Sequence, residues 1–138
     1  MEAILTSFAA AAPSASKARR RAGLALSALP AAFLLFDSVI KLALIRAVVE
    51  GTERLGFPVA TARPLGIVLL ACVLCYLWPR TAGLGAVLLT GYLGGAIAAH
   101  VRVGDPLFSH TLFPIYVAVL LWGGLYLRDP RVRALVRD

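Results

Sequence analysis

Two ionisable residues lie inside a long apolar stretch in the first third of the chain. Asp37 and Lys41 are four residues apart with the acid first, which on a helix places them on one face in the better order for a salt bridge. Each would cost roughly 2.5–3.5 kcal/mol at the centre of a membrane-spanning helix. Two later apolar stretches hold the imidazole of His100 and the phenol of Tyr116. Counted along their helices, all four side chains come to a similar depth, so we expect a polar pocket that opens toward the outer face of a membrane.

Two kinds of chemistry fit this pocket. His100 and Tyr116 would bind a quinone headgroup, and Asp37 with His100 would relay a proton. The alternative is structural: Asp37 and Lys41 neutralise each other, Lys41 extends its amine toward the membrane surface, and His100 lies at the interface. Buried ion pairs often serve only to specify a structure. The sequence leaves both readings open and identifies no catalytic residue.

Cys72 and Cys75 form a second candidate pair, spaced C-x-x-C in an apolar stretch. On a helix they share a face and would be able to form or exchange a disulfide. A reactive thiolate needs a helix N-terminus or nearby cations, whereas these residues lie among Leu, Val and Ala. We therefore expect small apolar filler, with a redox role as the lesser alternative. No further Cys or His stands at ligand spacing, so we expect no metal site.

The composition identifies the elements that carry these residues. The chain has 138 residues, of which 60% are hydrophobic and 15% are charged, against roughly 45–50% and about 25% in soluble domains. A short soluble protein cannot bury so much apolar surface. This excludes a soluble enzyme, a disordered protein and a secreted disulfide scaffold. The net charge of +7 does not indicate nucleic-acid binding, because the basic residues flank apolar runs instead of forming a stripe on a polar domain.

Four apolar runs predict an all-α, polytopic membrane protein. In lipid each backbone polar group must pair within the protein, so the runs are helices. We expect an antiparallel four-helix transmembrane bundle within residues 22–129, whose helices span about residues 22–45, 64–79, 82–101 and 111–127. The flanking residues 1–21 and 130–138 are expected to be a flexible basic tail and a short basic tail.

The basic residues predict the orientation of this bundle. Four arginines lie at one end of the helices, and nine basic residues lie at the other: Lys17, Arg19, Arg20, Arg21, Arg80, Arg128, Arg131, Arg133 and Arg137. The side richer in Lys and Arg is cytoplasmic in most membrane proteins, so we expect both termini in the cytoplasm. The first apolar stretch runs on past the signal-like residues Ala28–Ala32, which favours an uncleaved helix.

Several segments of the chain are similar to a known family. They are Tyr76–Thr81, Leu88–Ala96, His100–Gly104, Phe36–Ser38 with Lys41-Leu42, and Tyr126–Arg131. Over about residues 22–133 the chain resembles the DoxX-like family of small four-helix bacterial integral membrane proteins. The resemblance implies a multi-pass protein of the bacterial cytoplasmic (inner) membrane. Most such members have no established activity, but the wider group includes a subunit of a thiosulfate:quinone oxidoreductase, which implies a quinone or a redox partner protein.

Two functions follow as expectations. The first is a non-catalytic membrane subunit, or a bundle that binds a lipophilic small molecule. The alternative is the quinone-interacting membrane component of an oxidoreductase complex, with Asp37, Lys41, His100 and Tyr116 around the quinone. The small residues of Gly91-x-x-x-Gly95 favour close helix contact within the bundle or with a second copy of the chain. The expected surroundings are the lipid bilayer, without nucleic acid.

Overall fold

The structure, a computed structural model, describes residues 2–137, with side chains from residue 16 onward. It contains helices and no strand among these residues. The helices are α1 (Glu2–Ala43), α2 (Arg46–Arg54), α3 (Ala62–Leu77), α4 (Ala82–Arg102), α5 (Phe113–Arg128) and α6 (Pro130–Arg137), with a 3₁₀ turn η1 (Val59–Thr61) and a π-helical turn η2 (Leu107–Thr111). Four segments are long and apolar enough to cross a membrane: Ser16–Ala43, Val59–Leu77, Ala82–Arg102 and Leu107–Arg128. The predicted polytopic four-helix protein is confirmed.

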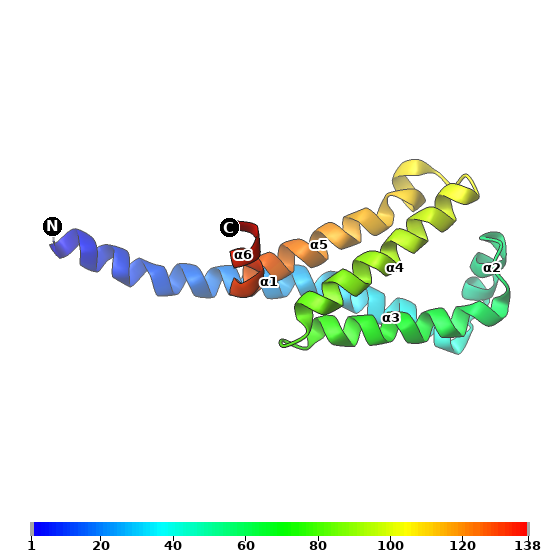
Figure 1. The fold of residues 1–138 in the computed structure, drawn as a ribbon, viewed down its shortest axis with the longest axis horizontal. Coiled ribbons are helices and arrows are strands. Elements are labelled where there is room, and N and C mark those ends of the chain that lie inside the picture. Colours follow the sequence, from blue (N-terminus) through cyan, green and yellow to red (C-terminus); the bar gives the residue numbers. More distant parts are fainter. Residues whose placement is uncertain (1, 138) are drawn as a thin grey trace.

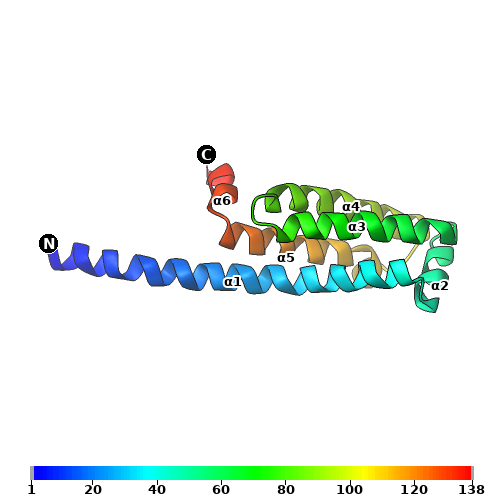
Figure 2. The same cartoon turned by 90° about the horizontal axis from the view of Figure 1, so that it is seen from below.

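The four long helices form an antiparallel bundle (Figure 1). Helix α1 packs against α3 and α5, and α4 packs against the same two neighbours, so α1 and α4 face each other across the bundle. Both chain ends lie at one end of the bundle, and α2 lies at the opposite end (Figure 2). One end of the bundle therefore holds the termini, and the other end holds the long connections between the helices.

Two segments differ from the tails expected from the sequence. Helix α1 begins at Glu2, so residues 2–21 continue it beyond the bundle as a rod of about 30 Å at 1.5 Å per residue. This stretch is rich in alanine, the residue with the highest helix propensity. Residues 130–137, in the segment expected to be a short basic tail, form α6. The second span also begins earlier than residue 64, because η1 precedes α3 and lengthens it.

Glycines set how closely the helices approach near the termini. A Cβ added to Gly23 would lie 2.8 Å from the Gly124 carbonyl, and one added to Gly124 would lie 2.6 Å from the Ser27 backbone nitrogen. Helices α1 and α5 therefore touch through their backbones. In the same way Gly85 of α4 lies against the backbone of Tyr76 in α3. Close backbone contact of this kind is how small residues hold membrane helices together.

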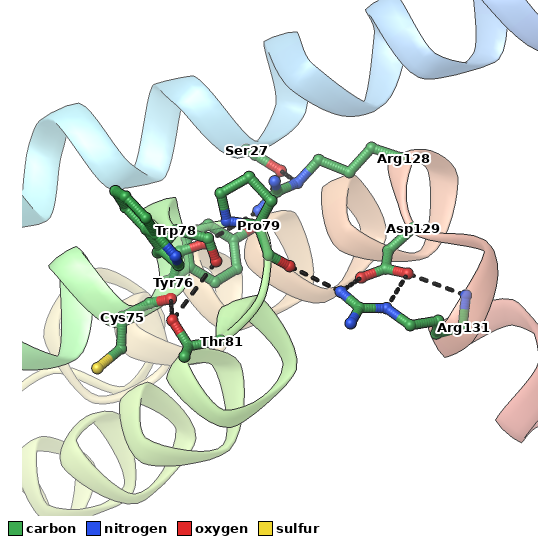
Figure 3. Close-up of polar contacts among 9 residues, drawn as sticks. All are labelled: Ser27, Cys75, Tyr76, Trp78, Pro79, Thr81, Arg128, Asp129 and Arg131. Carbon is green, nitrogen blue, oxygen red and sulfur yellow. Dashed lines mark hydrogen bonds and ion pairs between the residues drawn. The ribbon is translucent and has the colours of Figure 1, made fainter.

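Hydrogen bonds close the end of the bundle near the termini (Figure 3). The buried hydroxyl of Tyr76 donates to the Leu121 carbonyl at 2.7 Å and lies 2.9 Å from Ser27 Oγ. Arg128 donates to the same Ser27 oxygen at 3.0 Å, and its guanidinium lies 5.0 Å from the centre of the Tyr76 ring. One polar cluster thus joins α1, α3 and α5.

Helix α6 is attached to this end by an aspartate and an arginine. Asp129 accepts hydrogen bonds from the backbone nitrogen of Arg131 at 2.9 Å and from its guanidinium at 3.0 Å. Arg131 also donates to the carbonyl of Pro79, in the turn between α3 and α4, at 2.7 Å. The hydrogen bonds from Arg131 hold the pKa of the Asp129 carboxyl below its usual range. The negative charge at the start of α6 also favours this helix.

Candidate functional site

A cavity of about 490 Å³ lies between α1 and α4 in the half of the bundle away from the termini. Its walls come from the four spans, and most of the side chains that line it are apolar. Examples are Phe33 and Leu34 of α1 and Phe113 and Val117 of α5. Small-molecule sites in proteins measure roughly 300–1,000 Å³ and are largely apolar with a few polar groups. The cavity has the size and lining of such a site.

The sequence of α4 explains why this space is open. The part of α4 that lines the cavity consists mainly of small residues, Gly91, Gly95, Ala96 and Ala99. A Cβ added to Gly91 or Gly95 would meet no atom within 4 Å. Protein interiors are otherwise close-packed. Gly91 and Gly95, from which the sequence predicts close helix contact, thus leave space opposite α1.

The ion pair of Asp37 and Lys41 lies in the wall formed by α1. The two side chains, four residues apart, make the predicted salt bridge, and both line the cavity. They are only 25% and 22% exposed, respectively. Their charges cancel, so the pair adds polarity to the cavity without adding net charge. The ammonium group has three N–H donors, of which the carboxylate occupies one.

His100 lines the opposite wall from the last turn of α4. Its Nδ1 lies 2.5 Å from the carboxylate of Asp105, which also accepts two hydrogen bonds from Arg54 at 2.5 and 3.3 Å. The hydrogen bonds from His100 and then Arg54 hold the pKa of the Asp105 carboxyl below its usual range. A carboxylate only accepts hydrogen bonds, so Nδ1 of His100 carries a proton. Nε2 is then the ring nitrogen left for another partner.

The connection from α1 to α3 covers the end of the cavity that lies away from the termini. Thr52 of α2 and the following residues Leu55 and Phe57 line the cavity. Arg102 of α4 donates to the Leu55 carbonyl, and its guanidinium lies 5.1 Å from the centre of the Phe57 ring. Together with the ion pair of Arg54 and Asp105, these contacts fasten the connection onto α4. We call residues 52–57 the roof.

The structure brings three of the four predicted site residues together. Asp37, Lys41 and His100 all line the cavity, whereas Tyr116 does not. Tyr116 is 46% exposed, and its hydroxyl donates to the Phe108 carbonyl at 3.3 Å. Helical depth gives the level of a side chain but not the direction in which it faces, and α5 turns Tyr116 away.

The phenol in the cavity wall is that of Tyr92 instead. Tyr92 precedes Ala96, Ala99 and His100 by four, seven and eight residues, the spacing of one helix face. That spacing is the signal that identifies it in the sequence. The roof residues and the contact between Arg54 and Asp105 have no such signal, because 51 residues separate these two partners.

The second candidate pair lies elsewhere. Cys72 and Cys75 of α3 are free cysteines, and neither lines the cavity. Within the described residues there is also no group of three or more His, Cys, Asp and Glu side chains that could hold a metal ion. The polar groups of the cavity are therefore the ion pair, the phenol, the imidazole and the hydroxyl of Thr52.

Comparison with known proteins places the chain in a family. A family model described as the DoxX-like family matches residues 25–124. The match runs from α1 to α5 and includes the cavity, the roof and Asp105. No curated protein and no solved structure matches the chain. Because the family match covers most of the sequence, the chain belongs to the DoxX-like family.

Proposed function

We propose that this membrane protein binds a lipophilic small molecule in the cavity between α1 and α4 and is not itself a catalyst. The observation that carries the proposal is the cavity of about 490 Å³, whose mainly apolar walls include five polar side chains, Asp37, Lys41, Thr52, Tyr92 and His100. Apolar walls suit a hydrocarbon body, and a few polar groups fix the position of a polar head.

The position of the cavity supports a ligand that comes from the bilayer. Its walls belong to the four apolar spans, and the roof covers the end that the connections occupy. Arg54 and Arg102 hold that roof to Asp105 and to the Leu55 carbonyl. A molecule already dissolved in lipid reaches such a site without crossing the roof. We therefore infer a lipophilic ligand rather than a water-soluble one.

The alternative is that the ligand is a quinone and that the protein is the quinone-interacting component of an oxidoreductase complex. The observation that favours it is the pair of donors in the wall, the Lys41 ammonium and the Tyr92 hydroxyl, since quinone carbonyls accept hydrogen bonds. In this case the electrons would come from a redox partner protein.

The orientation of the bundle determines in which half of the membrane the cavity lies. We infer that both termini face the cytoplasm of a bacterial inner membrane, because nine basic residues lie at their end of the bundle and four arginines lie at the other. The cavity then lies in the outer half of the membrane.

Two neighbouring glycines of α4 allow a matched test of the binding function. A Leu at position 95 would extend into the cavity, whereas a Leu at position 94 would lie in a shallow groove outside it. A Cβ at either position meets no atom within 4 Å, so both variants are expected to fold. We expect Gly95→Leu to weaken binding of the apolar fluorophore 1-aminoanthracene at least tenfold and Gly94→Leu to leave it unchanged.

The measurement is a fluorescence titration of the full chain in detergent, with the melting temperature of each variant as a folding control. Extraction of the purified proteins with organic solvent, followed by mass spectrometry, would show which lipophiles are lost with Gly95→Leu. Equal fluorophore affinities of the wild type and folded Gly95→Leu would contradict a ligand site in this cavity.

A further inference from the structure

The pair of His100 and Asp105 decides which hydrogen-bonding group the cavity wall offers. Asp105 is almost fully buried, with 5% of its side chain exposed, and its carboxylate lies 2.5 Å from Nδ1 of His100. Arg54 neutralises the same carboxylate and keeps it in its acceptor form. In the neutral form of the imidazole, this contact places the proton on Nδ1. The ring nitrogen that remains, Nε2, is then an acceptor.

The neighbouring histidine does not provide this acceptor. The ring of His110 in η2 lies 5.9 Å from that of His100, but Nδ1 of His110 is within 2.8 Å of Ser109 Oγ, and His110 does not line the cavity. Across the cavity, one oxygen of the Asp37 carboxylate accepts from Lys41, so the acceptor on that wall lies next to a cation, whereas His100 lies on the wall formed by α4. Lys41 offers donors, so it matches an oxygen that accepts a hydrogen bond.

We propose that the cavity selects amphiphiles whose head carries a weakly acidic hydroxyl group, as in an alkylphenol, and that Nε2 of His100 accepts the hydrogen bond from that hydroxyl. The inference rests on the proposed binding function and adds the class of ligand. A phenol matches both walls, because its O–H donates to His100 while its oxygen accepts from Lys41 or Tyr92. A carbonyl or an ether matches only the donors. Asp105 is the positioning residue, since it acts on the ligand through the imidazole.

A pair of probes that differ only at the head tests this proposal. In 4-octylphenol the head is a hydroxyl, and in 4-octylanisole it is a methyl ether that accepts but cannot donate. Competition of each probe with 1-aminoanthracene, corrected for the affinity of each variant for the fluorophore, gives two constants for the full chain in detergent. We expect the phenol to bind about tenfold more tightly than the anisole, the size of one buried hydrogen bond.

Single-residue variants then test which side chains cause the preference for the phenol over the anisole. His100→Phe keeps an aromatic ring without nitrogens, and we expect it to bring the ratio of the two constants to about one. Asp105→Asn removes the carboxylate that fixes the imidazole, and we expect a smaller ratio with little change for the anisole. A general loss of structure would weaken both probes equally. His110→Phe is the matched control and should keep the wild-type ratio.

The outcomes separate this inference from the binding function. If the two probes compete equally in the wild type while Gly95→Leu abolishes fluorophore binding, the hydroxyl preference is wrong and the binding cavity stands. A preference that survives His100→Phe would contradict the assignment to His100. Loss of fluorophore binding in neither glycine variant would instead contradict the binding function itself.

Discussion

At the scale of single residues, Asp105 connects three parts of the chain. It lies in the sequence Gly-Asp-Pro, where a simple turn is the plain expectation, and the preceding Gly104 has a φ of 70° as such a turn requires. The structure adds two partners, Arg54 of α2 and His100 of α4. A single carboxylate thus holds the roof to the cavity wall and orients the imidazole.

The pH dependence of stability follows from the lowered pKa of Asp105. A carboxyl whose pKa is lower in the folded protein stabilises the fold above its ordinary pKa, and this contribution is lost as the pH falls through the lowered value. We expect the melting temperature of the wild type in detergent to fall between pH 7 and pH 3, and Asp105→Asn to show a smaller fall. Melting curves across this range check the prediction.

A second carboxyl provides the control for this experiment. The pKa of Asp129 is lowered by Arg131 at the opposite end of the bundle, so Asp129→Asn should reduce the acid sensitivity while leaving the roof intact. We expect acidification to release the bound fluorophore from the wild type and from Asp129→Asn. We expect a smaller release from Asp105→Asn. Parallel profiles for the wild type and Asp105→Asn would show that the contact with Arg54 and His100 adds nothing to stability.

At the scale of elements, glycine has two opposite uses in this bundle. Gly124 of α5 lies so close to α1 that an added Cβ would be 2.6 Å from the Ser27 backbone nitrogen. Gly91 and Gly95 of α4 instead leave the cavity open, since an added Cβ there meets nothing within 4 Å. The same residue type thus closes the bundle near the termini and opens it at the other end.

Adjacent glycines of α5 test the close contact of α1 with α5. We expect Gly124→Ala to destabilise the protein by about 1–3 kcal/mol, because backbone atoms of α1 cannot move aside for the methyl group. Gly123→Ala should change stability by less than about 0.5 kcal/mol, since an added Cβ meets no atom within 4 Å. Unfolding in mixed micelles with increasing SDS measures both. An unchanged midpoint for Gly124→Ala would contradict the close crossing of these helices.

At the scale of the whole molecule, the charges are unequally divided between the ends of the bundle. The four arginines Arg46, Arg54, Arg63 and Arg102 share their end with the acids Glu50, Glu53 and Asp105. The end of the termini also has three acids in the sequence, Glu2, Asp129 and Asp138, but nine basic residues; Asp129 is paired with Arg131. The excess positive charge of the chain therefore belongs to the end that we place in the cytoplasm.

Labelling with a membrane-impermeant maleimide tests this orientation. Cysteines placed at Ser16 and Ala134 should react only when the cytoplasmic side is accessible, whereas one at Gly51 of α2 should react from outside intact cells. The wild type is the background, because Cys72 and Cys75 lie within the span of α3. Labelling of Ser16→Cys or Ala134→Cys in intact cells, with Gly51→Cys unlabelled, would reverse the topology.

How much the sequence could predict depends on whether a property is local. The four spans and the salt bridge of Asp37 with Lys41 follow from hydrophobicity, length and helical spacing, all of which are read along the chain. Hydrophobicity does not predict the helical state of residues 2–21, although their alanine content favours it. Tyr116 was expected at the site because its depth is a local quantity.

What only the tertiary structure decided is the direction in which each helix faces and what covers the bundle. Packing against neighbours rotates α5 so that Tyr116 faces away, and it rotates α4 so that Tyr92 and His100 line one cavity. The roof exists because Arg54 meets Asp105 across 51 residues, and no local pattern encodes such a contact. The sequence by itself determined four membrane-spanning helices, since backbone polar groups in lipid must pair within the protein and the four apolar runs have the length of spanning helices. The cavity arose from how the helices pack.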